Sequence, residues 1–239
     1  MNRTSTMLAA MAGAAMIGGA ATAGIEELAG NLGGPLTDDA SVERSLGFDF
    51  NFYGVDYGSV FIGSNGILSF GDGETDFSPS LPEFESDPSG PAVAGLWTDL
   101  SPNISGSITL DTTVPGQATV NYVDVPRFGQ PDALNTFSVT LFENGNITFE
   151  YGDLGYGTST EETIVGLTDR SGAITTEVDW SSMMTWELPG AGTILGELYD
   201  NAGGNALDLA NSTITFVPAP GALALLGLAG LAGSRRRRG

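Results

Sequence analysis

Residues 137–151 constrain the fold more than any other part of the chain. Apolar and polar residues alternate from 137 to 141, and the same alternation resumes from 147 to 151. This period of two is typical of a β-strand with one buried face. Between the two runs lies Asn144-Gly145, a pair that tolerates the positive φ of a tight turn. The segment therefore predicts two antiparallel strands joined in a hairpin.

A second hairpin is predicted around Ser64-Asn65-Gly66, because apolar residues at 60–62 and 67–70 flank this turn. Leu46, Phe48, Phe50 and Phe52 alternate in the same way and indicate a half-buried strand. Six residues of these runs are expected in the core: Phe48, Phe50, Val139, Leu141, Ile147 and Phe149.

The rest of the body has the same character. Further short strands are expected at Val93–Trp97, Ser107–Leu110, Thr119–Val125, Thr163–Leu167, Ile174–Val178 and Thr213–Val217. Turn signals recur between them and no long helical period interrupts them, which predicts an all-β, antiparallel β-sandwich. Asp72–Pro91 is expected to be a long loop and Pro189–Asn205 to be irregular.

The first 23 residues have the pattern of a secretory signal peptide. Arg3 precedes an apolar stretch, Met7–Ala20, and Ala21-Thr22-Ala23 supplies the small residues that signal peptidase requires. We expect a helix in the apolar stretch and cleavage after Ala23. The body of the protein is then exported from the cytoplasm.

The last 23 residues contain three features in a fixed order. Val217, Pro218, Ala219 and Pro220 form a Pro-flanked motif, and a charge-free apolar run follows from Gly221 to Gly233. Four arginines then close the chain: Arg235, Arg236, Arg237 and Arg238. Because arginines resist crossing hydrocarbon, we expect a short transmembrane helix that stops with its C-terminus in the cytoplasm. An ordinary tail anchor is the simplest alternative.

This order of motif, span and arginine cluster resembles the PEP-CTERM sorting signal of Gram-negative bacteria, in a VPAP variant. The resemblance implies recognition by an exosortase, a transpeptidase-like cysteine protease of the membrane. That enzyme would cleave near the Pro motif and release or transfer the protein to the cell surface. The chain thus divides into a signal peptide (1–23), a β-sandwich body (24–216) and a sorting signal (217–239).

Within the body, residues from about Ser45 to Thr168 resemble a nidogen-like (NIDO) domain. The matching stretches are FDFNFYGVDYGSVFIGSNGILSFG from Phe48, VAGLWTDLSP from Val93, VNYVDVPRF from Val120, NTFSVTLFENGNITFEYGDL from Asn135 and TIVGLTDRSG from Thr163. Members of this family occur as extracellular matrix and adhesion modules, so the resemblance implies a non-catalytic surface role.

Composition excludes several chemistries. The chain has no cysteine and no histidine, which removes disulfides, Ser-His-Asp and Cys-His catalysis, and His-ligated zinc or iron. It also has no lysine. The predicted body keeps three arginines against 29 acidic residues, a formal charge of −26. Such a body is repelled by nucleic acid and attracts cations.

Carboxylates are therefore the candidate functional groups. Asp72, Glu74 and Asp76 alternate in a Gly-containing loop, a spacing that Ca²⁺ loops use, although a solvated turn explains it better. Asp99 and Glu143, near Trp97, are a candidate pair for a hydrolytic or sugar-binding cleft.

The sequence favours one function over two alternatives. The favoured hypothesis is a secreted, exosortase-processed surface or exopolysaccharide-matrix protein with an adhesive or structural role and no catalytic residues or required cofactor. Its expected partners are signal peptidase, exosortase, and an extracellular polysaccharide or matrix protein. A carbohydrate-active enzyme that uses two carboxylates and a Ca²⁺-dependent, lectin-like module are the alternatives.

Overall fold

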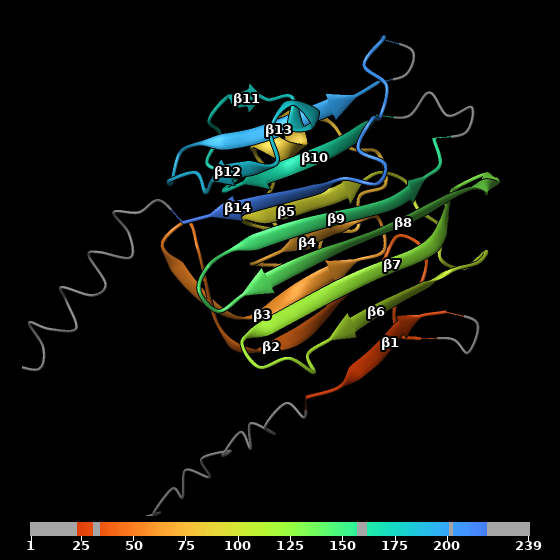
Figure 1. The fold of residues 1–239 in the computed structure, drawn as a ribbon, viewed down its shortest axis with the longest axis horizontal. Helices are drawn as coiled ribbons and strands as arrows, with labels where there is room; N and C mark the ends of the chain where they lie inside the picture. Colours follow the sequence, from red (N-terminus) through yellow and green to blue (C-terminus); the bar gives the residue numbers. More distant parts are fainter. Residues whose placement is uncertain (1–22, 31–33, 157–161, 201–202, 219–239) are drawn as a thin grey trace, which may run out of the picture.

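The computed structural model describes residues 23–30, 34–156, 162–200 and 203–218, which form a β-sandwich of two sheets (Figure 1). The first sheet has the order β1 (Ile25–Ala29), β6 (Ser107–Asp111), β7 (Gln117–Arg127), β8 (Gln130–Phe142), β9 (Ile147–Leu154), β14 (Thr213–Val217) and β12 (Thr185–Glu187). The second has the order β11 (Thr175–Glu177), β13 (Ile194–Tyr199), β10 (Thr163–Thr168), β5 (Ala92–Trp97), β4 (Ile67–Ser69), β3 (Val55–Gly63) and β2 (Ser41–Phe52).

Both predicted hairpins are present. β8 and β9 are antiparallel, with Leu141 opposite Ile147, and Gly145 adopts a φ of 86° in the turn between them. β3 and β4 pair around Asn65-Gly66, where Gly66 has a φ of 79°. The glycine after each asparagine thus occupies the left-handed region that a side chain disfavours.

The core lies between the two sheets, and five of the six residues expected there are buried. Phe48 is the exception, because it is only half-buried. Gly47, in the left-handed region with a φ of 81°, lies where the β2–β3 register shifts between Ser45 and Phe50. This irregularity interrupts the strict alternation on which the prediction for Phe48 rested.

Two tyrosine hydroxyls connect the sheets across the core. Tyr122 donates to the carbonyl of Gly63 at 2.7 Å, and Tyr151 donates to the carbonyl of Gly95 at the same distance. Burial raises the pKa of both tyrosines well above its ordinary value, so both hydroxyls remain protonated donors. The Tyr122 ring also stacks on Phe137, with centroids 4.4 Å apart.

The structure corrects three details of the predicted fold. The sandwich is not wholly antiparallel, since β11 pairs with β13 and β12 pairs with β14 in parallel. The segment Pro189–Asn205 contains strand β13, and the loop Asp72–Pro91 contains a short helix, α1 (Leu81–Glu85). Ser80 caps this helix by accepting from the backbone N–H of Glu83.

The described residues contain no helix that is long and apolar enough to span a bilayer. The signal helix and the C-terminal transmembrane helix expected from the sequence lie outside the described residues.

The first and last strands of the described body share one end of the sandwich. From β1 through β6, β7, β8 and β9 to β14, every neighbouring pair is antiparallel. The beginning of β1 therefore lies at the same end of the sheet as the end of β14, to the left in Figure 1. We call this end the chain-end pole. It also holds the Asn144-Gly145 turn between β8 and β9.

Candidate functional site

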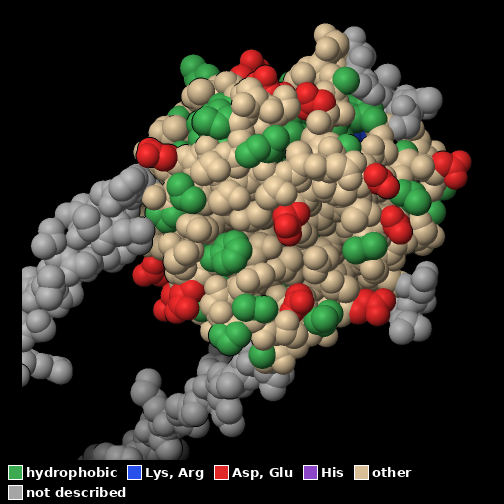
Figure 2. All heavy atoms as spheres, viewed as in Figure 1, with side chains coloured by type: hydrophobic (Ala, Val, Ile, Leu, Met, Phe, Trp, Pro, Cys, Tyr) green, Lys and Arg blue, Asp and Glu red, His purple; other side chains and the backbone are tan. Residues whose placement is uncertain are grey.

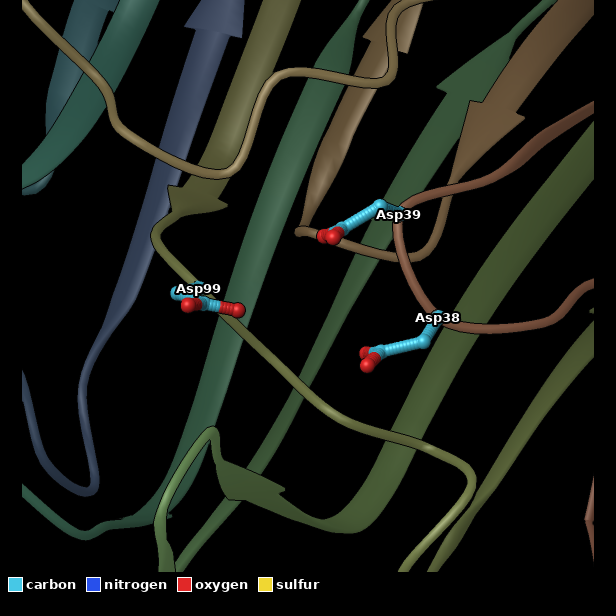
Figure 3. A group of neighbouring side chains, drawn as sticks. All are labelled: Asp38, Asp39 and Asp99. Carbon is cyan, nitrogen blue, oxygen red and sulfur yellow. The ribbon is translucent and has the colours of Figure 1, made fainter.

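Three aspartates converge at the opposite end of the sandwich, which we call the aspartate pole. Asp38, Asp39 and Asp99 each present one carboxylate oxygen, and these atoms lie within 4.8 Å of one another (Figure 3). Asp99 is buried, Asp38 is half-buried and Asp39 is exposed. We refer to the three residues as the aspartate cluster.

Local structure brings these residues together across 60 positions of sequence. Asp38 and Asp39 end the loop that precedes β2, whereas Asp99 follows β5. Asn65, in the β3–β4 turn, connects the two segments. Its amide nitrogen donates to Asp39 Oδ1 at 3.0 Å, and its amide oxygen accepts from the backbone N–H of Leu100 at 3.0 Å.

The cluster is electrostatically unfavourable for at least one member. Burial raises the pKa of Asp38, a hydrogen bond with Ser101 lowers it, and the neighbouring charge of Asp39 raises it further, with a net upward shift. Asp38 Oδ1 is buried and has no hydrogen-bond partner among the described residues. Convergent carboxylate oxygens are the ligands that Ca²⁺ prefers, so a cation is the species this arrangement would accommodate.

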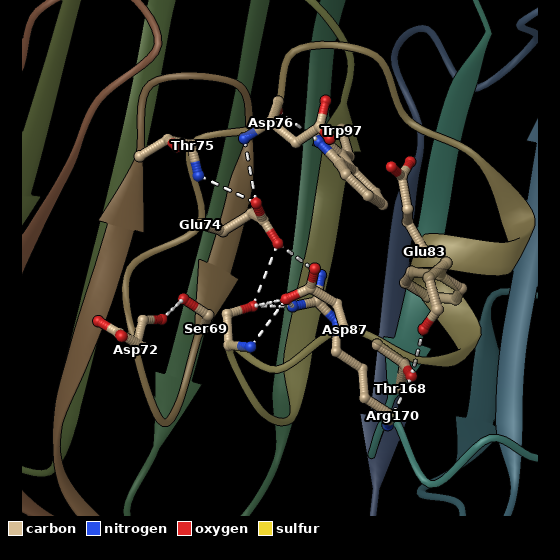
Figure 4. Close-up of polar contacts among 12 residues, drawn as sticks. Ser69, Asp72, Glu74, Thr75, Asp76, Glu83, Asp87, Trp97, Thr168 and Arg170 are labelled. Atoms are coloured by element: carbon tan, nitrogen blue, oxygen red, sulfur yellow. Dashed lines mark hydrogen bonds and ion pairs between the residues drawn. The ribbon is translucent and has the colours of Figure 1, made fainter.

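The predicted Ca²⁺ loop has a different arrangement (Figure 4). Glu74 is buried and forms an ion pair with Arg170 Nη2 at 2.9 Å. Asp72 is exposed, and its carboxylate accepts from the N–H of Gly73, whereas that of Asp76 accepts from the N–H of Ser78. The three side chains are not among the convergent carboxylates of the described residues. Glu74 thus differs from a residue of a solvated turn, because its carboxylate is buried in an ion pair.

Arg170 organises that loop. Its guanidinium pairs with Glu74, with Asp87 Oδ1 at 2.9 Å and with the hydroxyl of Ser89. Burial raises the pKa of Asp87, but hydrogen bonds from Ser89 and the charge of Arg170 outweigh it, so the pKa is lowered. We refer to Glu74, Asp87, Ser89 and Arg170 as the arginine cluster.

The other two arginines of the body also connect separate elements. Arg127 of the first sheet is fully buried and donates to the hydroxyls of Thr98 and Thr163 beside the second sheet. Arg44 of β2 pairs with Glu26 of β1 at 2.7 Å. No local sequence pattern indicates these roles, although the rarity of basic residues among so many acidic ones is a signal that each arginine has a specific partner.

The candidate enzyme pair is not brought together. The backbone carbonyl of Asp99 accepts from the N–H of Phe128, next to the start of β8, whereas Glu143 follows the end of the same 13-residue strand. The two carboxylates thus lie at opposite poles. Trp97 is fully buried, and its indole N–H donates to the carbonyl of Asp76 at 3.1 Å.

The described residues reach only part of the predicted processing sites. Val217 ends β14, Pro218 is the last described residue, and Ala23 is exposed just before β1. The other sorting and processing residues lie outside the described residues: Ala21, Ala219, Pro220 and Arg235, Arg236, Arg237 and Arg238.

The surface charge is dispersed. Figure 2 shows acidic side chains separated from one another over the face that it presents, with little basic surface between them. This distribution gives a negative surface without a single dominant acidic patch on that face.

A family model described as NIDO related matches residues 20–192 of the chain. The match extends from before β1 to just before β13. No curated protein and no solved structure matches the chain.

Proposed function

The chain belongs to the NIDO-related family, and on this premise we propose that it is a secreted surface or matrix protein with a non-catalytic, adhesive or structural role. Signal peptidase removes residues 1–23, and an exosortase acts at the sorting signal, 217–239. The body, 24–216, passes through the inner membrane and is held briefly by the C-terminal span. It then reaches the cell surface or the extracellular space, where a polysaccharide or a matrix protein is its partner.

One structural observation carries this proposal. The beginning of β1 and the end of β14 lie at the same pole of the sandwich. Two membrane segments attached there can occupy one bilayer while the body stays folded on one side of it. If the ends left from opposite poles, a short connection could not reach the same membrane without unfolding part of a sheet.

The sorting step is tested by the intact mass of the protein collected from the cell surface. We expect the mature chain to lack Arg235 to Arg238, and deletion of the exosortase to leave a precursor in the membrane fraction. A variant in which Arg235 to Arg238 are replaced by serine is the control, because it tests whether these arginines act as the cytoplasmic stop signal. Surface-released protein that still carries the arginines contradicts the proposal.

The non-catalytic role is tested on the purified body, residues 23–217. Glycosidase, esterase and protease panels are expected to show no turnover, because Asp99 and Glu143 lie at opposite poles. A turnover lost on Asp99→Asn or Glu143→Gln, but retained in Asp72→Asn, would favour the enzyme alternative instead.

The Ca²⁺-dependent alternative now has one observation in its favour, and it concerns the aspartate cluster. Its three oxygens converge and Asp38 Oδ1 is buried without a partner. This alternative predicts that Ca²⁺ raises the melting temperature of the wild type, that EDTA reverses the rise, and that Asp38→Asn abolishes it. Asp72→Asn is the matched control. An equal loss of the Ca²⁺ response in that variant would indicate that Ca²⁺ binds in the loop that contains Asp72 and not at the aspartate cluster.

A further inference from the structure

A row of threonines crosses the outer face of the first sheet, the face that points away from the core. One threonine comes from each of the neighbouring strands β7, β8, β9, β14 and β12, and each is the Cα partner of the next. In that order they are Thr119, Thr140, Thr148, Thr215 and Thr185, which we call the threonine row. Their neighbours along the strands, such as Val139 and Phe149, are buried in the core, so the alternation of a β-strand directs the threonines outward.

An adjoining row on the same face has similar chemistry. It contains Thr109, Asn121, Ser138, Glu150 and Thr213, again as successive Cα partners. We call the two rows together the hydroxyl face. Its one ionisable side chain is Glu150, although the chain has 29 acidic residues, and Asp111 of β6 adjoins Thr119 at the margin. Figure 2 shows few acidic side chains at the centre of this side of the molecule. The hydroxyl face is therefore nearly neutral within an acidic body.

The corresponding outer face of the second sheet is covered. Phe84 of α1 is fully buried there and packs against Trp97 of β5, with ring centroids 6.4 Å apart. Together with Ile67, Ala94 and other apolar residues of that sheet, they form a separate hydrophobic cluster. Over β7, β8 and β9, by contrast, no described element lies in front of the first sheet (Figure 1). The hydroxyl face is thus the sheet face that the described part of the fold leaves open to a partner.

The threonines of the row orient one another. The hydroxyl oxygens of Thr119 and Thr140 lie 3.0 Å apart, and those of Thr148 and Thr215 lie 3.4 Å apart. Thr140 is buried between its neighbours, whereas the other three are half-buried and Thr185 is exposed. In a hydrogen-bonded pair of hydroxyls, one donor and several lone pairs remain for a ligand. Because β-branched side chains are stiff at χ1, little rotamer entropy is lost when a ligand binds them.

From this we infer that the hydroxyl face binds an uncharged polysaccharide, which lies across the strands along the threonine row. This rests on the proposed adhesive role and specifies its surface and its class of partner. Sugar hydroxyls donate and accept hydrogen bonds as threonine hydroxyls do, and the row presents one side chain every ~4.8 Å, the spacing of neighbouring strands. The net negative charge of the body repels an acidic polysaccharide. A protein partner would need aromatic or other apolar anchors, and the two rows contain none.

Affinity electrophoresis of the purified full-length chain tests this assignment, in native gels that contain galactomannan, dextran or alginate and a polyoxyethylene detergent. Wild type should be retarded by a neutral polysaccharide and not by alginate, which is anionic. Thr148→Val with Thr215→Val removes one hydroxyl pair of the threonine row and should weaken the affinity about tenfold. The matched control is Thr176→Val with Thr193→Val, a pair of exposed threonines outside the hydroxyl face, which should bind as wild type does.

A second variant separates lost hydrogen bonds from a disturbed strand. Thr148→Ser with Thr215→Ser keeps both hydroxyls and should keep the wild-type affinity, and melting temperatures show that each variant is folded. Selective retardation by a neutral polysaccharide, lost in the valine pair alone, supports the inference.

Three results would overturn the inference: no retardation of wild type by either neutral polysaccharide, equal retardation by alginate, or equal weakening in the control pair. Failure of the function on which it rests is read separately. Cleavage of the bound polysaccharide would overturn the non-catalytic role, and arginines retained on surface protein would overturn the sorting step. Neither of these two results alters the binding measurement.

Discussion

The aspartate cluster and the arginine cluster both contain carboxylate side chains, but the carboxylates affect the stability of the fold in opposite directions. In the arginine cluster, Glu74 and Asp87 converge on a buried guanidinium, and the pKa of Asp87 is lowered. In the aspartate cluster, carboxylates converge on one another, and the pKa of Asp38 is raised. The first arrangement stabilises the fold at neutral pH, whereas the second opposes it. A carboxylate whose pKa is raised by burial and by a neighbouring charge, in a group of convergent carboxylates, is a candidate for a binding role.

The largest expected effect comes from removing the cation of the arginine cluster. Arg170→Ala leaves Glu74 buried without its partner, and such a loss costs about 3–5 kcal/mol in the free energy of unfolding. Urea denaturation of the purified body measures it. Arg44→Ala is the matched control, because its pair with Glu26 is partly exposed and should contribute at most about 1 kcal/mol. Equal losses in the two variants would contradict the role given to Arg170.

A smaller effect is expected from Asp87, which is partly exposed. Asp87→Asn should lower the free energy of unfolding by on the order of 1 kcal/mol at neutral pH, after allowance for solvent screening. Because the folded-state pKa of Asp87 is lowered, its contribution is complete above the unfolded pKa and is lost as the pH falls through the folded value. Urea midpoints of variant and wild type should therefore converge in acid. A difference that persists at low pH would point to lost packing instead.

The smallest effect, and one of opposite sign, is expected at Asp38. Because its folded-state pKa is raised, ionisation opposes folding above that pKa, and the penalty is absent below the unfolded pKa. Asp38→Asn should stabilise the cation-free body at neutral pH by less than about 1 kcal/mol, and the gain should fade in acid. Thermal melting across pH measures this, with the exposed Asp72→Asn as a charge-matched control. If Asp38→Asn were destabilised at neutral pH, the aspartate cluster would stabilise the fold as the arginine cluster does, and the contrast between the two clusters would be wrong.

The sequence predicted the hairpins well because each depended on neighbouring residues. Alternating apolar residues and an Asn-Gly pair are sufficient to specify a hairpin such as β8–β9, because all of these residues are close in sequence. Both predicted turns are confirmed. Strand β13 was missed because its glycine suggested irregular structure. Gly196 is needed there, since a Cβ would lie 3.0 Å from the ring of Phe84. The glycine is required by a contact with helix α1, which is distant in sequence, so no local pattern reveals why a glycine stands in this strand.

The candidate site was predictable only in its chemistry. Because the chain has no histidine and no cysteine, carboxylates were the expected functional groups, and the aspartate cluster does consist of carboxylates. The alternating carboxylates of the Asp72 loop are visible in the sequence because they are neighbours along the chain. Asp99 and the Asp38-Asp39 pair belong to segments that meet only when β2, β3 and β5 share a sheet. Glu74 was assigned to solvent because its partner, Arg170, is 96 residues away.

The position of β1 has a practical consequence for coupling chemistry. Without lysine, the only primary amine of the chain is its N-terminal α-amino group. In the intact chain the backbone N–H of Gly24 lies at the chain-end pole, where it donates to the hydroxyl of Thr112 at 3.2 Å. On a body that begins at Gly24, this nitrogen would be the α-amino group. An amine-reactive dye or sensor surface would therefore attach every molecule at one site and in one orientation. The aspartate pole would face the solution.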